Sequence, residues 1–137
     1  MKYSIIVPVF NRPDEVGELL DSLSRQTVKD FEVVIVEDGS QRPCKDVCDG
    51  FTGKLDIKYF MKENSGPGQS RNYGAEHASG DYLIILDSDV VLPESYLQAV
   101  SDELSQEEAD AFGGPDRSHP SFTDTQKAIS YSMTAFL

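Results

Sequence analysis

The sequence predicts a single α/β domain in which a mostly parallel sheet carries helices on both faces. Its 137 residues fit one domain, because single cores usually contain about 100–200 residues. Hydrophobic residues make up 39% and charged residues 26%, a globular balance with enough apolar material for a core. Buried-strand patterns alternate with helical patterns along the chain, which is typical of parallel strands joined by right-handed crossovers.

The first part of the chain contains two predicted strands, each followed by a helix. Residues 3–9 are apolar and β-branched, which predicts a buried strand ending near Pro8. Asn11 is a candidate N-cap for the next helix, whose predicted inner face is Val16, Leu19, Leu20 and Leu23. Residues 31–37 predict a second buried strand that stops at a turn. Pro43 then opens a short helix with one face made of Cys44, Val47, Cys48 and Phe51.

The middle of the chain continues the same alternation. Residues 55–60 predict a third strand, and a loop separates them from a helix over 69–78. Small residues in that helix would allow close approach to a sheet: Gly74, Ala75 and Ala78. Residues 82–86 predict a fourth strand, which ends at the acidic turn Asp87-Ser88-Asp89.

The last part of the chain predicts two more helices and a strand. Pro93 is expected in the first turn of a helix that buries Leu97, Val100 and Leu104. Residues 109–112 predict a fifth strand, and residues 123–137 a final helix that aligns Ile129, Met133 and Phe136. The whole pattern is Rossmann-like.

The charge and apolar pattern exclude several partner classes. Acidic residues outnumber basic residues 24 to 12, which gives a formal charge of −12. Such a field repels polyanions, so we expect no nucleic acid partner. A small phosphate ligand stays compatible if carboxylates hold a divalent metal. The longest apolar run, residues 82–86, is far shorter than the about 20 residues of a membrane-spanning helix.

The two cysteines, Cys44 and Cys48, are four residues apart and so share one face of a helix. We interpret them as reduced core residues rather than as metal or redox ligands. That interpretation fits a reducing, cytoplasmic setting. No signal-peptide core precedes Pro8.

Polar turns follow several predicted strands and would meet at one edge of a parallel sheet. Asp87 and Asp89 could converge on Mg²⁺ or Mn²⁺, although an acidic turn could also cap the helix at Pro93. Asp38 could accept a hydrogen bond from a nucleobase or ribose, or form a turn with its own backbone. Arg71, after a glycine loop, could meet a phosphate or a base, or be a surface side chain.

Four ordered motifs resemble the family 2 inverting glycosyltransferases of the GT-A fold: Ser4-Ile-Ile-Val-Pro-Val-Phe-Asn11, Val36-Glu-Asp-Gly-Ser40, Gly66-Pro-Gly-Gln-Ser-Arg-Asn72 and Gly80-Asp-Tyr-Leu-Ile-Ile-Leu-Asp-Ser-Asp89. The resemblance covers nearly the whole chain. It implies a nucleotide pocket formed by Pro8, Val9, Phe10, Asp38, Arg71, Asp87 and Ser88. It also implies a divalent metal, Mn²⁺ or Mg²⁺, held by Asp87 and chiefly by Asp89.

The resemblance further implies metal-dependent transfer of a sugar, with inversion, from a nucleotide-sugar to an acceptor hydroxyl. A UDP-sugar is the first expectation for the donor, and a saccharide or lipid-linked molecule for the acceptor. The alternative is a nucleotide-sugar-binding module without transfer activity. Family members carry the catalytic base in a later half, so we expect residues 1–137 to be one domain truncated from a longer, membrane-associated enzyme. The apolar C-terminal residues would then favour self-association.

The sequence departs from the family pattern at three positions. Phe10 replaces a frequent Tyr, Glu37 a common Asp, and Val90 a frequent Asp after the acidic turn. Rival α/β classes fit less well. A receiver domain needs an acidic pair after the first strand, and a nucleotidyltransferase or dinucleotide-binding domain needs a glycine-rich loop there. Residues 8–11 offer neither feature.

Overall fold

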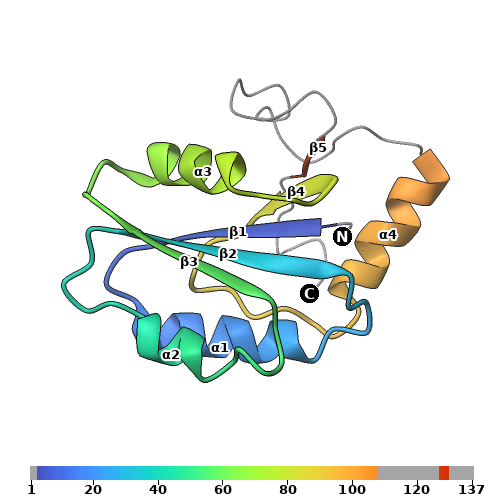
Figure 1. The fold of residues 1–137 in the computed structure, drawn as a ribbon. Coiled ribbons are helices and arrows are strands. Elements are labelled where there is room, and N and C mark those ends of the chain that lie inside the picture. Colours follow the sequence, from blue (N-terminus) through green and yellow to red (C-terminus); the bar gives the residue numbers. More distant parts are fainter. Residues whose placement is uncertain (1–2, 108–126, 130–137) are drawn as a thin grey trace.

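The computed structural model describes residues 3–107 and 127–129, which form a five-stranded sheet with helices on both faces (Figure 1). Every neighbouring pair of strands is parallel, and the strand order is β3-β2-β1-β4-β5. The strands are β1 (Tyr3–Val9), β2 (Phe31–Asp38), β3 (Ile57–Lys62), β4 (Tyr82–Ile85) and β5 (Lys127–Ile129). The helices are α1 (Pro13–Ser24), α2 (Lys45–Asp49), α3 (Pro67–Glu76) and α4 (Tyr96–Glu107). The predicted parallel α/β architecture is therefore confirmed.

The sheet separates two apolar clusters of unequal size. On the face covered by α1 and α2, alternate residues of β1 such as Ile5 and Val7 pack with leucines of α1 and α4 in the larger cluster. On the opposite face, Ile6 packs with Val34, Val36, Leu83 and Ala75 beneath α3. Because strand side chains alternate between faces, one apolar strand sequence supplies both clusters.

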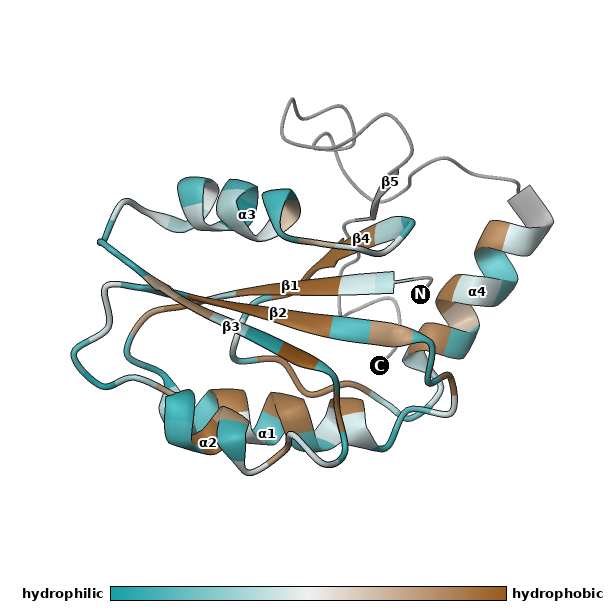
Figure 2. Ribbon diagram, in the orientation of Figure 1, coloured by the Kyte–Doolittle hydropathy of each residue, from teal (hydrophilic) through white to brown (hydrophobic). Residues whose placement is uncertain are grey.

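Helices α1 and α3 bury different kinds of residue, as their colours in Figure 2 indicate. The predicted inner face of α1 is confirmed, with Val16, Leu19, Leu20 and Leu23 all fully buried. Helix α3 is mostly hydrophilic and buries Ser70, Gly74 and Ala75. A Cβ atom on Gly74 would lie 2.5 Å from Ile6 Cγ2, so α3 approaches the sheet closely there.

Asn11 is not the N-cap of α1, contrary to the prediction. Arg12 occupies the N-cap position and makes no side-chain cap hydrogen bond. Asn11 has a φ of 53°, a left-handed conformation that asparagine tolerates better than most residues. Its Oδ1 accepts hydrogen bonds from the N–H groups of Gln41 (2.7 Å) and Arg42 (2.9 Å). Asn11 therefore fixes the loop after β2 against the end of β1.

Several element boundaries differ from the predicted ones. Strand β3 begins and ends two residues later than expected, and α4 begins at Tyr96 rather than around Pro93. The predicted helix over 123–137 is wrong at Lys127–Ile129, which pair with β4 as β5. The edge of β4 offers free backbone hydrogen-bonding groups to these residues. The helical spacing of apolar residues, on which the prediction rested, does not reveal such a partner. Residues 109–112, Met133 and Phe136 lie outside the described residues.

Candidate functional site

A cavity of about 380 Å³ lies at the carboxyl end of the sheet, where the parallel strands end together. Every site residue predicted from the sequence lines it: Pro8, Val9, Phe10, Asp38, Arg71, Asp87, Ser88 and Asp89. Arg12, Pro67 and Ile85 complete the lining. Arg12 belongs to a polar turn after the first strand, which the sequence already indicated as part of the site. Pro67 and Ile85 were not predicted, although Pro67 lies between the two glycines of the loop and Ile85 lies near the end of a strand.

One wall of the cavity is apolar and aromatic. Pro8, Val9 and Ile85 come from the ends of β1 and β4. Phe10 follows β1 and is 50% exposed, which is unusual for so large an apolar side chain. An exposed ring beside a cavity can stack on a planar ligand such as a nucleobase.

Another part of the lining is acidic. Asp87 and Asp89 are exposed while Ser88 between them is buried, so the two carboxylates are open to a ligand. The alternative of a capping turn is not supported, because α4 begins seven residues beyond Asp89 at Tyr96. Within the described residues, no group of three or more His, Cys, Asp or Glu side chains could hold a metal. The pair fits a magnesium-type cation that shares its coordination with water and a diphosphate.

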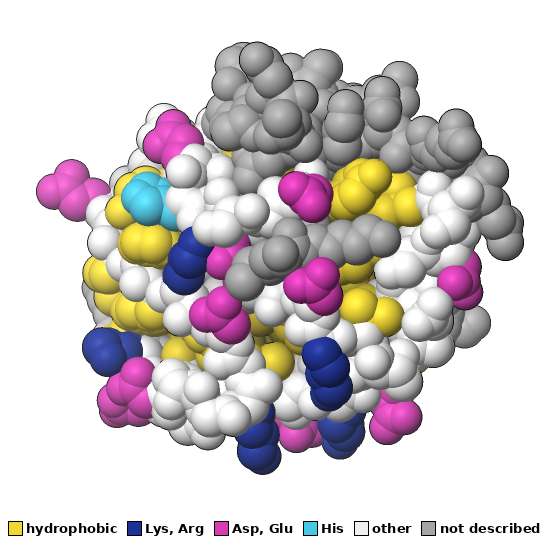
Figure 3. Space-filling model, turned by 45° about the vertical axis from the view of Figure 1, so that its right-hand side comes forward, with side chains coloured by type: hydrophobic (Ala, Val, Ile, Leu, Met, Phe, Trp, Pro, Cys, Tyr) yellow, Lys and Arg dark blue, Asp and Glu magenta, His cyan; other side chains and the backbone are white. Residues whose placement is uncertain are grey.

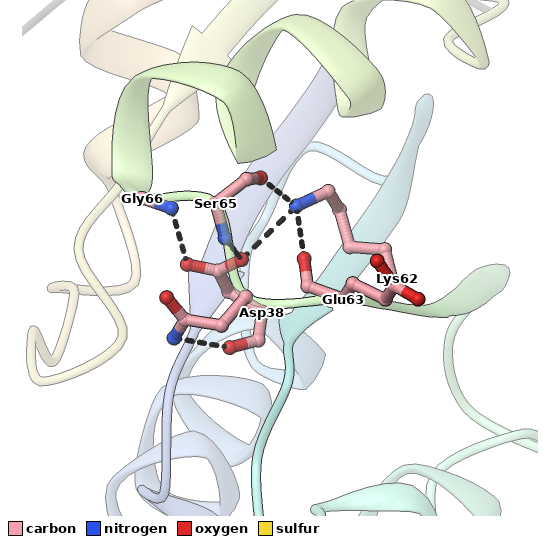
Figure 4. Close-up of polar contacts among 6 residues, drawn as sticks. Asp38, Lys62, Glu63, Ser65 and Gly66 are labelled. Carbon is pink, nitrogen blue, oxygen red and sulfur yellow. Dashed lines mark hydrogen bonds and ion pairs between the residues drawn. The ribbon is translucent and has the colours of Figure 1, made fainter.

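The carboxylate of Asp38 is held by the loop that leads into α3 (Figure 4). Its Oδ1 accepts hydrogen bonds from Lys62 Nζ (3.0 Å) and the Ser65 N–H (2.8 Å), and its Oδ2 from the Gly66 N–H (2.9 Å). Burial opposes the charged carboxylate, but these hydrogen bonds outweigh burial and lower the pKa of Asp38 below its ordinary value. We call Asp38, Lys62, Ser65 and Gly66 the N-terminal clamp of α3.

This clamp bears on the two interpretations of Asp38. The Asp38 carboxylate does organise local backbone, but it binds the N–H groups of Ser65 and Gly66 in the loop before α3 rather than its own neighbouring backbone. A carboxylate offers about four lone-pair sites, and the clamp uses three of them. The clamp therefore does not use the full acceptor capacity of the Asp38 carboxylate, and the residue still lines the cavity.

A second clamp holds the other end of α3. Lys58 Nζ lies 2.9 Å from Glu32 Oε1 and donates to the His77 carbonyl (3.1 Å) and Ser79 Oγ (2.8 Å). Glu32 Oε2 accepts hydrogen bonds from the Ser79 N–H (2.6 Å) and Ser4 Oγ (2.5 Å). We call Glu32, Lys58 and Ser79 the C-terminal clamp. Both clamps have a signal in the sequence. Their charged residues stand at even-numbered positions of β2 and β3, and alternate positions of a strand share one face of the sheet.

Cys44 and Cys48 lie on the face of the sheet that α1 and α2 cover. Both are free and buried, as predicted. Their sulfur atoms are 3.9 Å apart. Next to them, Glu37 Oε1 accepts a hydrogen bond from the Cys44 N–H. Glu37 therefore points away from the cavity that its neighbour Asp38 lines.

Acidic side chains are scattered over the face shown in Figure 3 rather than gathered in one patch.

No helix in the described part of the chain is long and apolar enough to cross a membrane.

The family model described as glycosyl transferase family 2 matches residues 4–135. The chain belongs to glycosyl transferase family 2, as its motifs predicted. Glycosyltransferase GlyA of Streptococcus pneumoniae is 34% identical over 111 residues, which are 80% of this chain and 16% of that protein. The poly(ribitol-phosphate) beta-N-acetylglucosaminyltransferase TarS of Staphylococcus aureus is 32% identical over 114 residues, 80% of this chain and 20% of that protein.

Solved structures of S. aureus TarS share the fold. The TarS 1–349 structure in complex with UDP has a TM-score of 0.76 and 30% sequence identity, over 83% of this chain and 37% of that one. The complex of the same protein with UDP-GlcNAc gives a TM-score of 0.75. The predicted GT-A type of fold is therefore confirmed. The chain spans less than half the length of each of these relatives.

Proposed function

We propose that this chain binds a nucleotide-sugar and forms the donor half of an enzyme that transfers the sugar to an acceptor hydroxyl with inversion. The observation that carries the proposal is the convergence of all the predicted site residues on one cavity. The 30% identical TarS structures contain UDP and UDP-GlcNAc, which supports a UDP-sugar as the donor.

Each wall of the cavity has a proposed part in binding the donor. Phe10 stacks on the base, while Asp38 accepts a hydrogen bond from a nucleoside N–H or hydroxyl through its remaining acceptor capacity. Arg71 pairs with the base or the diphosphate, and Arg12, on the same lining, adds a second positive charge near phosphate. These cations matter because the chain as a whole is strongly acidic and would otherwise repel the ligand.

Asp87 and Asp89 are the residues that would hold Mn²⁺ or Mg²⁺, with Asp89 as the main ligand and Asp87 also facing the ribose. A divalent cation there would neutralise the diphosphate and make it a better leaving group. Two open carboxylates are the oxygen ligands that such a cation shares with phosphates.

Inversion requires a base that takes the proton of the acceptor hydroxyl, and its absence costs about 10²–10⁴-fold in rate. We assign no described residue to that role. We propose instead that the base and the site for a saccharide or lipid-linked acceptor belong to further parts of a longer enzyme, as the short coverage of the relatives suggests. A nucleotide-sugar-binding module without transfer activity is the second candidate. A cytoplasmic setting stays a prediction. Self-association through the C-terminal residues also stays a prediction, since residues 130–137 lie outside the described residues.

Titration calorimetry with UDP tests the proposal. Binding in the presence of Mn²⁺ should be lost or strongly weakened in EDTA. Asp89→Ala should weaken binding at least about tenfold, or roughly 1.4 kcal/mol. Asp81→Ala is the matched control, because Asp81 is an exposed acid at the opposite end of β4 and should leave the affinity unchanged. Equal UDP affinity in Mn²⁺ and EDTA would argue against the metal site, and no binding of any nucleoside diphosphate would reject the function.

A transfer assay separates the two candidate functions. The complete enzyme containing this domain should release UDP from a UDP-sugar only when an acceptor is present, and the product should have the inverted anomeric configuration. Tight nucleotide-sugar binding without any transfer would favour the binding module.

A further inference from the structure

Helix α3 carries one wall of the candidate nucleotide cavity but has little apolar anchoring. Pro67 and Arg71 of α3 line the cavity. The helix buries Ser70, Gly74 and Ala75, whose side chains are small. At about 25 cal/mol per Å² of buried apolar surface, such side chains contribute far less than the leucines of α1 do. Tyr73 adds one larger apolar contact, because its partly buried ring packs edge-on against Phe60. The position of α3 therefore depends on polar contacts as well.

Polar contacts at the start of α3 supply that anchoring. The Ser65 and Gly66 N–H groups, just before the helix, donate to Asp38. The side-chain amide of Asn64 donates to the Asp38 carbonyl oxygen (3.0 Å). Asn64 also packs tightly against Gly39, where an added Cβ atom would lie 2.8 Å from the Asn64 nitrogen. Residues 64–66 are thus fastened to the end of β2.

Lys62 completes this arrangement from the end of β3. Its ammonium group donates to Asp38 Oδ1 (3.0 Å), to the Glu63 carbonyl oxygen (2.7 Å) and to Ser65 Oγ (Figure 4). A lysine ammonium has three N–H donors, so each can have a partner here. The side chains of the Lys62–Asp38 pair are 16% and 7% exposed, so the contact is largely shielded from solvent.

We propose that Lys62 is a positioning residue for the nucleotide site. It holds the loop of residues 63–66, and through that loop the start of α3, where Pro67 and Arg71 face the cavity. The inference rests on the proposed function, because its consequence is nucleotide affinity. Among the described residues, those that line the cavity do not include Lys62, so it acts through Asp38 and the loop rather than on the ligand.

The C-terminal clamp provides a matched control. Lys58 lies on the same strand, four residues from Lys62, and likewise pairs with a buried carboxylate of β2. Its partners, His77 and Ser79, follow α3 rather than precede it. Removing either lysine leaves a buried carboxylate without its cation, which is destabilising in both cases. The loop that leads to the cavity wall is affected only at Lys62.

The test measures UDP affinity by calorimetry in the presence of Mn²⁺ for the 137-residue chain and three variants. Lys62→Met should weaken binding about tenfold, because the loop loses the ammonium group that joins the Glu63 carbonyl oxygen and Ser65 Oγ to Asp38, and the buried carboxylate loses its cation. The UDP affinity of Lys58→Met should stay within about twofold of that of the unaltered chain, even if its melting temperature falls as far as that of Lys62→Met. Lys62→Arg, which keeps the charge and the donors, should recover most of the affinity.

Amide hydrogen exchange supplies a readout that does not depend on nucleotide. Lys62→Met should speed exchange over residues 63–71 and leave residues 77–81 unchanged, and Lys58→Met should do the reverse. Unchanged affinity and unchanged exchange over 63–71 in Lys62→Met would overturn the inference, as would an equal loss of affinity in Lys58→Met. If the unaltered chain binds no nucleoside diphosphate, the proposed function fails, and the exchange data alone then decide whether Lys62 holds the loop.

Discussion

The two faces of the sheet are built on different physical principles. The face under α1 and α2 is covered by large apolar side chains that fill one continuous core with α4. The face under α3 has a small apolar cluster of five buried residues, bordered at each end by a lysine–carboxylate pair. Apolar burial is strong but non-directional, whereas charged hydrogen bonds are directional.

This difference matches where the candidate site lies. The cavity lies at the carboxyl end of the sheet, and its lining includes Pro67 and Arg71 of α3, the helix that is held by polar contacts. Segments that bind ligands are generally drawn from the less stable parts of a fold. We therefore expect substitutions on the α1 face to change stability alone, and substitutions around the start of α3 to change stability and nucleotide binding together.

The largest expected effect is on the α1 face. Leu19→Ala removes a fully buried side chain from the larger core and should lower the free energy of unfolding by about 2–5 kcal/mol. Urea denaturation measures the loss. Met61→Ala is the control, because Met61 is 48% exposed and should cost less than about 0.5 kcal/mol. Equal losses would mean that the larger cluster is not the main source of stability.

The second effect is the pH dependence of the N-terminal clamp. The pKa of Asp38 is lowered by the clamp, so its contribution to stability is present above the unfolded pKa of about 3.9 and is lost as the pH falls through the folded pKa. Asp38→Asn should cost about 1–3 kcal/mol at pH 7. The difference in unfolding free energy between the two proteins should shrink as the pH falls from 6 to about 3. A difference independent of pH would show that the Asp38 charge does not contribute.

The third effect tests the close approach of α3 to the sheet. Gly74→Ala should lower stability by about 1–2 kcal/mol, because the new methyl group meets the stiff, buried side chain of Ile6. Gly68→Ala on the same helix has open space and should be neutral or stabilising, since alanine favours helix. Thermal denaturation of the two variants decides the matter, and a stabilised Gly74→Ala protein would contradict the close packing.

The smallest effect concerns the aromatic wall and assumes the proposed function. Phe10→Ala should weaken UDP binding by about 0.5–1.5 kcal/mol, which corresponds to the loss of one stacking contact. Its unfolding free energy should hardly change, because half of the side chain is already exposed. Phe10→Tyr keeps the ring and should bind as well as the unaltered chain. If the alanine variant binds UDP normally, Phe10 does not stack on the base.

The sequence by itself determined the architecture and most of the residues that line the candidate cavity. Apolar periodicity located the four strands of residues 3–107 and the inner faces of α1 and α4, because burial dictates which positions are apolar. The parallel arrangement then implied that the ends of β1, β2 and β4 meet at one edge, and the predicted residues do line one cavity there. The family motifs pointed to the same residues.

Only the tertiary structure decided how the polar side chains are used. Local signals suggested that Asn11 caps α1 and that residues 127–129 are helical, but Asn11 binds the loop after β2 and those residues pair with β4. Strand alternation puts Lys62 and Asp38 on one face of the sheet, but it does not reveal that these residues, 24 positions apart, meet and hold the start of α3. The hydrophobicity of each residue indicates whether that residue is buried, so burial can be predicted from local sequence. A hydrogen bond depends instead on two groups that distant parts of the chain bring together.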